Sequence, residues 1–170
     1  MTTNRHILSV LVENKSGVLA RISGLISRRG FNIHSLAVGE TEDPHVSRMT
    51  VTVDADDVAL EQVVKQLNKL VEVLKVVELD PLASVTSQIV LVKVRAEASN
   101  RSGILETAQM FKAKIVDTTS DAMTLQVYGN TDKIAAMLEI LEPYGIKELV
   151  QSGVVAIGRG PRSITDRSRH

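Results

Sequence analysis

Residues 14–19 read Asn-Lys-Ser-Gly-Val-Leu, and residues 100–105 read Asn-Arg-Ser-Gly-Ile-Leu. The two stretches are 86 residues apart. Each follows an aliphatic, β-branched segment typical of a buried strand and opens a segment with apolar residues at helical spacing. The same strand-to-helix junction therefore occurs twice, which indicates an internal repeat.

The pattern around the first junction predicts a βαββαβ unit. We expect a strand at 6–12, a helix from 18, strands at 32–39 and 46–53, a helix from 56 or 57, and a strand at 71–79. Ser16 is a candidate N-cap for the first helix, and Gly30 is a candidate stop after it. Asp56 or Asp57 is expected to cap the second helix.

The pattern begins again after Asp80-Pro81. We expect strands at 89–96, 114–119, 122–128, 146–150 and 153–157, with helices around 104–111 and from Asn130 or Thr131. The predicted fold class is α+β, with two tandem ferredoxin-like βαββαβ domains at 1–80 and 84–158. The polar, basic residues 159–170 are expected to be a disordered tail.

The composition excludes several classes of protein. Among 170 residues, 44% are hydrophobic and the 20 Lys and Arg balance the 20 Asp and Glu, which argues against a disordered or nucleic-acid-binding chain. Aromatic residues make up only 2%, too few for a base-stacking surface. There is no cysteine, no long apolar run and no signal-peptide pattern, so we expect a cytoplasmic protein.

No combination of residues indicates catalysis. The histidines are His6, His34, His45 and His170, and no common catalytic or nucleotide-binding motif accompanies them. His34 is better explained as a surface or interface residue than as a general base. The acidic residues Glu40, Glu42 and Asp43 surround a turn, where solvated charge is a better explanation than a metal site. We therefore expect no catalytic and no metal-binding residues in this chain.

The first junction, Asn14–Leu19, contains groups that could bind a charged ligand. The first N–H groups of a helix have no partner within the helix, and the helix dipole attracts an anion to them. Gly17 lets a ligand approach the backbone closely, and Asn14 offers both a donor and an acceptor, which suits a zwitterion. The alternative is an ordinary polar turn capped by Ser16. The spacing alone leaves both interpretations open.

Residues 32–39 form the second predicted strand, which lies at a sheet edge in the usual βαββαβ order. This strand carries no formal charge before Glu40, although soluble proteins seldom leave such an edge unprotected. Either another part of the chain covers it, or it pairs with a second copy. Twofold antiparallel pairing would bring the partner's Asn32 and Ile33 towards the Asn14–Leu19 junction.

Three motifs, in this order and spacing, resemble a known family. They are Asn14-Lys-Ser-Gly-Val-Leu19, Arg29-Gly-Phe-Asn-Ile-His-Ser-Leu36 and Ser47-Arg-Met-Thr50. Together they resemble the ACT domain of the acetolactate synthase regulatory (small) subunits. The later Gln151-Ser-Gly-Val-Val-Ala156 is also similar to that family, so the resemblance covers an N-terminal ACT domain and a C-terminal ACT-like domain.

The resemblance implies a noncatalytic subunit of branched-chain amino acid biosynthesis. Such a subunit binds and activates the catalytic large subunit, on which thiamine diphosphate, Mg and FAD are expected, and confers feedback inhibition by valine. It implies a homodimer through ACT edge strands, with valine at the interface and no cofactor of this chain's own. The implied effector-binding residues are Asn14, Ser16, Gly17, Val18 and Leu19, with Asn32 and Ile33 from the partner.

Two other functions are weaker alternatives. A free-standing amino-acid-sensing ACT protein would share the motifs and act on a different target. A nucleic-acid-binding ferredoxin-like module would need aromatic residues on its sheet, which are missing here. The repeat at Asn100–Leu105 is either a second pocket or a vestigial turn.

Overall fold

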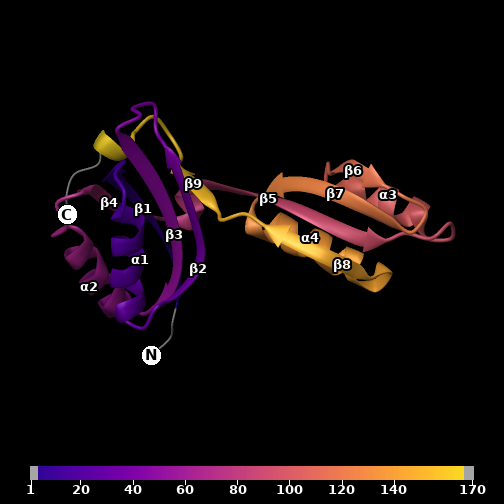
Figure 1. The fold of residues 1–170 in the computed structure, drawn as a ribbon, viewed down its shortest axis with the longest axis horizontal. Helices are drawn as coiled ribbons and strands as arrows, with labels where there is room; N and C mark the ends of the chain where they lie inside the picture. The colour runs from indigo at the N-terminus through magenta and orange to yellow at the C-terminus, as the bar shows by residue number, and fades with distance from the viewer. Residues whose placement is uncertain (1–3, 167–170) are drawn as a thin grey trace. The chain divides into compact units, whose positions relative to one another are not determined.

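The computed structural model describes residues 4–166, which fold into two compact units. Unit 1 combines the chain up to Val85 with the chain from Val154 onwards, and unit 2 spans Thr86–Gly153 (Figure 1). Residues 154–158, which the sequence analysis places in the second domain, therefore belong with the first. The chain leaves unit 1, completes unit 2 and returns.

Unit 1 contains one antiparallel sheet and two helices. Its elements are β1 (Asn4–Glu13), α1 (Val18–Arg28), β2 (Asn32–Glu40), β3 (Val46–Ala55), α2 (Asp57–Leu67) and β4 (Val73–Leu79). The strand order is β2-β3-β1-β4, so β2 lies at one edge as predicted. The predicted βαββαβ pattern is confirmed.

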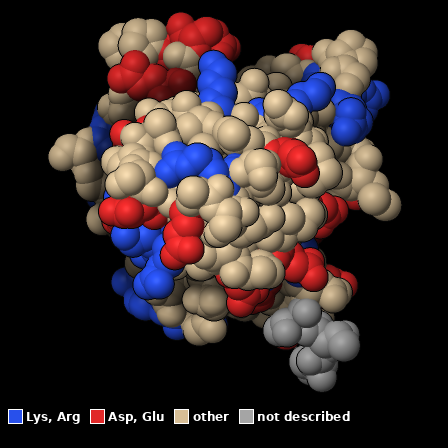
Figure 2. Space-filling view, turned by 90° about the vertical axis from the view of Figure 1, so that its right-hand side faces the viewer, with Lys and Arg blue, Asp and Glu red and all other residues tan. Residues whose placement is uncertain are grey.

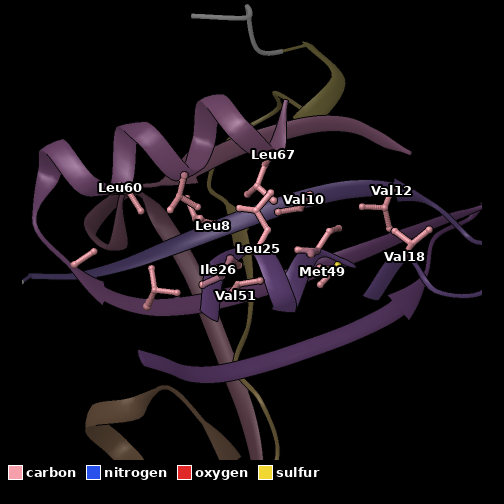
Figure 3. Close-up of a cluster of buried hydrophobic side chains, with 14 residues drawn as sticks. Leu8, Val10, Val12, Val18, Leu25, Ile26, Met49, Val51, Leu60 and Leu67 are labelled. Carbon is pink, nitrogen blue, oxygen red and sulfur yellow. The ribbon is translucent and has the colours of Figure 1, made fainter. Parts of the chain in front are cut away.

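The core of unit 1 lies between the sheet and the two helices (Figure 3). Alternate residues of β1, beginning with Leu8, point into it, and α1 contributes one apolar stripe that includes the fully buried Ile22. Asp56 caps α2 by accepting a hydrogen bond from the N–H of Ala59 at 2.7 Å. Gly30 has a φ of 76° just after α1 ends, which confirms the predicted stop.

Unit 2 repeats the pattern with its own core. Its elements are β5 (Ser84–Arg95, which begins in unit 1), α3 (Arg101–Met110), β6 (Lys114–Thr118), β7 (Ala122–Gly129), α4 (Thr131–Leu141), the short 3₁₀ helix η2 (Glu142–Tyr144) and β8 (Ile146–Gln151). The strand order is β6-β7-β5-β8. Asn130 caps α4 by accepting from the N–H of Lys133 at 2.8 Å. Both predicted halves are therefore present.

Residues 154–166, here called the return segment, lie on unit 1. They contain β9 (Val155–Gly158), which pairs with β5, and the 3₁₀ helix η3 (Ile164–Asp166), which packs against β4. The N–H of Arg159 donates to the Ala83 carbonyl at 2.8 Å. Residues 159–166 therefore differ from the expected disordered tail, because backbone hydrogen bonds and sheet contacts hold them. Residues 167–170 lie outside the described range.

Charge is well mixed on the face shown in Figure 2, where acidic and basic side chains are interspersed among uncharged ones. This distribution agrees with the formal net charge of zero. Among the described residues, no helix is both long and apolar enough to cross a membrane.

The position of α1 depends on the burial of Ile22, which leads to a first prediction. Replacing Ile22 with Ala should lower the free energy of unfolding by about 2–5 kcal/mol, because the sheet cannot close around the vacated volume. Urea unfolding followed by circular dichroism measures this loss. The control is Leu82→Ala, at a side chain that is 91% exposed. Equal midpoints for the two variants would contradict the described core.

Candidate functional site

The chain bends sharply between β1 and α1, and Gly17 makes the bend possible. Gly17 is the N-cap residue of α1 and has a φ of 86° and a ψ of −11°, in the left-handed region. Residues other than glycine rarely adopt this backbone conformation. A Cβ placed on Gly17 would meet nothing within 4 Å, so the bend opens outward.

The prediction that Ser16 caps α1 is wrong. No side chain accepts a hydrogen bond at the start of this helix. The left-handed turn makes Gly17 the last residue before the helix, which places Ser16 one position too early for its hydroxyl to serve as the cap. The helix start therefore lacks the side-chain oxygen that would otherwise occupy its N–H groups.

The backbone donors at this bend are available to a ligand. Within residues 4–166, the N–H groups of Gly17, Leu19 and Ala20 make no hydrogen bond. The N–H of Val18 reaches the Lys15 carbonyl only at 3.4 Å, a long contact, and Arg21 is the first residue with a regular helical bond, to Gly17 O at 3.1 Å. Unpaired donors at the positive end of a helix dipole form a site for a carboxylate.

Asn14 ties the bend to the β2–β3 hairpin. Its Nδ2 donates to Pro44 O at 2.9 Å and to Glu40 Oε1 at 3.3 Å, and its backbone N–H donates to His45 O at 2.8 Å. The amide nitrogen is therefore committed within the chain, and the side-chain oxygen is the atom left to accept from a ligand. Sequence reasoning missed Glu40 and Pro44, because their contact with Asn14 depends on the pairing of distant strands.

Ion pairs support the other side of the bend. Arg21 pairs with Glu72, the residue before β4, and Lys15 Nζ lies 2.9 Å from Glu13 Oε2. The pKa of the Glu72 carboxyl is lowered first by its own backbone N–H and then by Arg21. The pKa of Lys15 is raised mainly by its hydrogen bond to Glu13. The first pair joins the first turn of α1 to the residue before β4, and the second joins the bend to the end of β1.

Within one chain, the predicted residues Asn32 and Ile33 lie far from the bend. They begin β2, where Asn32 is opposite Asp54, whereas the bend adjoins the other end of β2, where Glu40 is opposite Ser47. A separation of eight strand residues corresponds to about 25 Å. The structure therefore brings Asn14, Ser16, Gly17, Val18 and Leu19 together and leaves Asn32 and Ile33 apart from them.

The end of β2 is linked to the bend by the Asn14–Glu40 hydrogen bond, and the outer edge of this strand is open. In the part of the chain that the structure describes, β2 pairs with β3 alone. The N–H of Val154 reaches the Ser35 hydroxyl at 3.3 Å, but this is a side-chain contact and not strand pairing. Two apolar side chains are also exposed here, Leu19 by 44% and Val38 by 46%. The edge thus retains its capacity to pair with another strand.

The repeated motif at Asn100 has a different geometry. Helix α3 begins at Arg101, so Gly103 lies inside the helix, whereas its counterpart Gly17 precedes α1. The N–H of Ile104 donates to Asn100 O at 3.2 Å, and Asn100 Oδ1 accepts from the N–H of Glu97 at 2.7 Å.

Two side chains occupy the space around this second junction. The Arg101 guanidinium donates to Thr118 Oγ1 at 2.9 Å and to Ser120 O at 3.0 Å. A Cβ on Gly103 would collide with the Tyr144 hydroxyl. This junction lacks the open bend of the first and supports the vestigial interpretation.

The histidines of the first sheet contact charged side chains of other strands. His34 is exposed, and its Nδ1 lies 3.4 Å from Arg5 Nη2. His6 is buried, with Nδ1 at 2.6 Å from Glu78 Oε1. No group of three or more His, Asp or Glu residues is arranged to hold a metal ion among residues 4–166.

A βαββαβ unit with an open glycine bend beside an unpaired edge strand has the features of an ACT domain. Residues 8–75 match the AHAS small subunit-like ACT domain model, and residues 87–160 match the model for the small subunit of acetolactate synthase. The chain belongs to the acetolactate synthase small-subunit family.

Relatives and a solved structure agree with this assignment. The chain is 54% identical over 162 residues to the acetolactate synthase small subunit of Mycolicibacterium smegmatis, covering 95% of each sequence. It is 48% identical over 165 residues to a probable acetolactate synthase small subunit of Methanothermobacter thermautotrophicus, covering 96% of this chain and 98% of the relative. The crystal structure of the small subunit from Thermotoga maritima superimposes with a TM-score of 0.85 and 37% identity, covering 94% of this chain and 99% of that one.

The lowered pKa of Glu72 predicts an acid-sensitive contribution to stability. A carboxyl with a lowered folded-state pKa stabilises the protein above its unfolded pKa of about 4.3, and this contribution is lost as the pH falls through the folded value. Glu72→Gln should therefore show a smaller fall in melting temperature than the native chain between about pH 5 and pH 3. Arg21→Gln should show a weaker form of the same change, because the backbone N–H of Glu72 remains. An unchanged acid response in Glu72→Gln would contradict this.

Proposed function

We propose that the chain is the regulatory subunit of acetolactate synthase and that valine is its effector. In this proposal the chain activates a thiamine-diphosphate-dependent catalytic subunit in the cytoplasm and makes that subunit sensitive to feedback inhibition. The observation that carries the proposal is the row of unpaired N–H groups at the Gly17 bend, in a chain of this family. Thiamine diphosphate, Mg and FAD would belong to the catalytic subunit.

The chemistry of the bend suits the head group of an amino acid. The effector carboxylate would accept from the N–H groups of Gly17 and Leu19, and its ammonium would donate to Asn14 Oδ1. Burying an isopropyl group contributes roughly 2 kcal/mol. With the charged contacts added, a total of about −5 to −8 kcal/mol corresponds to micromolar to submillimolar binding, a useful range for sensing a metabolite.

A second copy of the chain would complete this pocket. Antiparallel pairing of β2 with its counterpart places the start of one strand against the end of the other. Asn32 and Ile33 of the second copy would then lie beside Glu40 and the Gly17 bend of the first. The open edge of β2 and the exposed Leu19 and Val38 support this dimer.

Mixing the purified chain with the catalytic subunit tests the proposal directly. Acetolactate formation should rise when the chain is added and fall again when valine is added. Calorimetry on the chain alone, together with its mass in solution, should show valine binding to a dimer. A catalytic rate that changes neither with the chain nor with valine would remove the proposal and favour a free-standing amino-acid sensor.

Substituting Gly17 tests the location of the site. Gly17→Asp should abolish detectable valine binding, because its carboxylate would repel the ligand carboxylate from the N–H groups. Gly17→Ala is the matched control, since it imposes a similar backbone strain of about 1–2 kcal/mol without charge. We expect the Ala variant to retain measurable binding by calorimetry, with circular dichroism confirming that both variants are folded. Native affinity in a folded Gly17→Asp variant would place the effector elsewhere.

A further inference from the structure

The return segment crosses the sheet of unit 1 on the face opposite the helices. Helices α1 and α2 cover the face that contains Leu8 and its alternate neighbours in β1. Ile7 points to the other face, where it forms a separate buried cluster with Leu79 and with Ala156 of β9. The segment, yellow in Figure 1, therefore covers the second side of this sheet.

The first contact of the return segment is with the proposed dimer edge. The N–H of Val154 donates to Ser35 Oγ in β2 at 3.3 Å, and the same hydroxyl donates to Thr52 Oγ1 in β3 at 3.1 Å. Val154 is therefore linked to the strand that borders the effector bend and would meet the second copy.

The segment then meets the middle of the sheet. Arg48 of β3 donates from Nη2 to Ala156 O at 3.4 Å and from Nε to Ser9 Oγ of β1 at 2.8 Å. Ala156 itself is 7% exposed, whereas its neighbour Ile157 is 58% exposed and faces away from the cluster. The guanidinium thus links β9 to the two central strands.

The end of the return segment also lies on β4. Beyond Arg159, which donates to Ala83 O, η3 packs against β4. Lys75 of β4 also lowers the pKa of Asp166 in η3, after the larger effect of the Ser163 hydrogen bonds. In order along the chain, Val154 contacts β2, Ala156 contacts β3, β1 and β4, and η3 contacts β4 again.

The link from this segment to unit 2 is very short. Ser152 is fixed in unit 2, because its N–H donates to Ile89 O at 3.0 Å and its hydroxyl accepts from the N–H of Ile89 at 2.9 Å. Val154 is already fixed in unit 1. Gly153 is the only residue between these two anchors. The anchor in unit 1 and the anchor in unit 2 are therefore separated by a single residue along the chain.

We propose that the return segment relays effector binding at the β2 edge to unit 2 through Gly153. The inference rests on the proposed function, because it concerns how the same effector acts. Effector binding and dimer pairing would bias the position of β2, and Ser35 would transmit that bias to Val154 and the adjoining Ser152. If the effector shifts the equilibrium between two positions of the segment tenfold, it must bind one position more tightly than the other by about 1.4 kcal/mol.

Lengthening the link tests the relay while leaving both anchors intact. Gly-Gly-Ser is inserted between Gly153 and Val154, and as a matched control the same tripeptide is inserted between the exposed Arg162 and Ser163. We expect both chains to bind valine within threefold of the native affinity by calorimetry. In the complex with the catalytic subunit, the Gly153 insertion should raise the half-inhibitory valine concentration at least tenfold, and the control should match the native chain. A native inhibition curve for the Gly153 insertion would overturn the relay.

A second pair of variants detaches the segment from the sheet. Ala156→Asp places a charge in the buried cluster with Ile7 and Leu79, and Ile157→Asp is the exposed control. We expect Ala156→Asp to bind valine and to lose inhibition as the Gly153 insertion does, while Ile157→Asp is inhibited normally. Loss of valine binding in Ala156→Asp, with the native fold retained, would make the segment part of the pocket and overturn the relay. If the native chain bound no valine, the proposed function itself would fail.

Discussion

The left-handed conformation at Gly17 is the constraint on which the candidate site depends. It turns the chain from β1 into α1 within a few residues, and it leaves the helix without a side-chain cap. An ordinary capped start would have satisfied one or two of the N–H groups. The open donors exist because the sequence places a glycine, and not a capping serine, at the last position before the helix. The burial of Ile22 and the Arg21–Glu72 pair then hold the helix so that these donors keep their direction.

The second junction shows that the motif alone does not determine the local geometry. Gly103 has similar neighbours in sequence to Gly17, yet α3 starts earlier and Gly103 lies within it. Tyr144, contributed from far along the chain, fills the space that is open at Gly17. Local sequence similarity therefore identified the repeated strand-to-helix junction, while the space around each glycine depends on residues outside the motif.

The sequence predicted what depends on local pattern. The alternation of β1, the apolar stripe of α1 and the caps at Asp56 and Asn130 follow from residues near one another, and the edge position of β2 follows from the usual order of a βαββαβ sheet. Contacts between distant segments were missed. The amide of Asn14 bonds to the hairpin at Pro44, and polar residues after Gly158 lie on β4, although their composition resembles that of a flexible tail. Composition reports whether a segment can form a core of its own, but it does not report whether a neighbouring sheet has a free face.

The two faces of the sheet in unit 1 differ in how much apolar surface is buried against them. This difference is relevant to the proposed relay. Fourteen buried residues form the core under α1 and α2, whereas three buried residues, among them only one small alanine from β9, form the cluster beneath the return segment. Val77 packs against that cluster, Leu11 is also buried on this face, and the fully buried Ser9 accepts a hydrogen bond from Arg48. Apolar burial contributes roughly 25 cal/mol per Å², so the segment is held far less firmly than the helices. Local opening occurs where buried apolar contact is smallest. The return segment is held by the pairing of β9 with β5, by a few hydrogen bonds and by this small cluster, so it is expected to open before the core beneath the helices does.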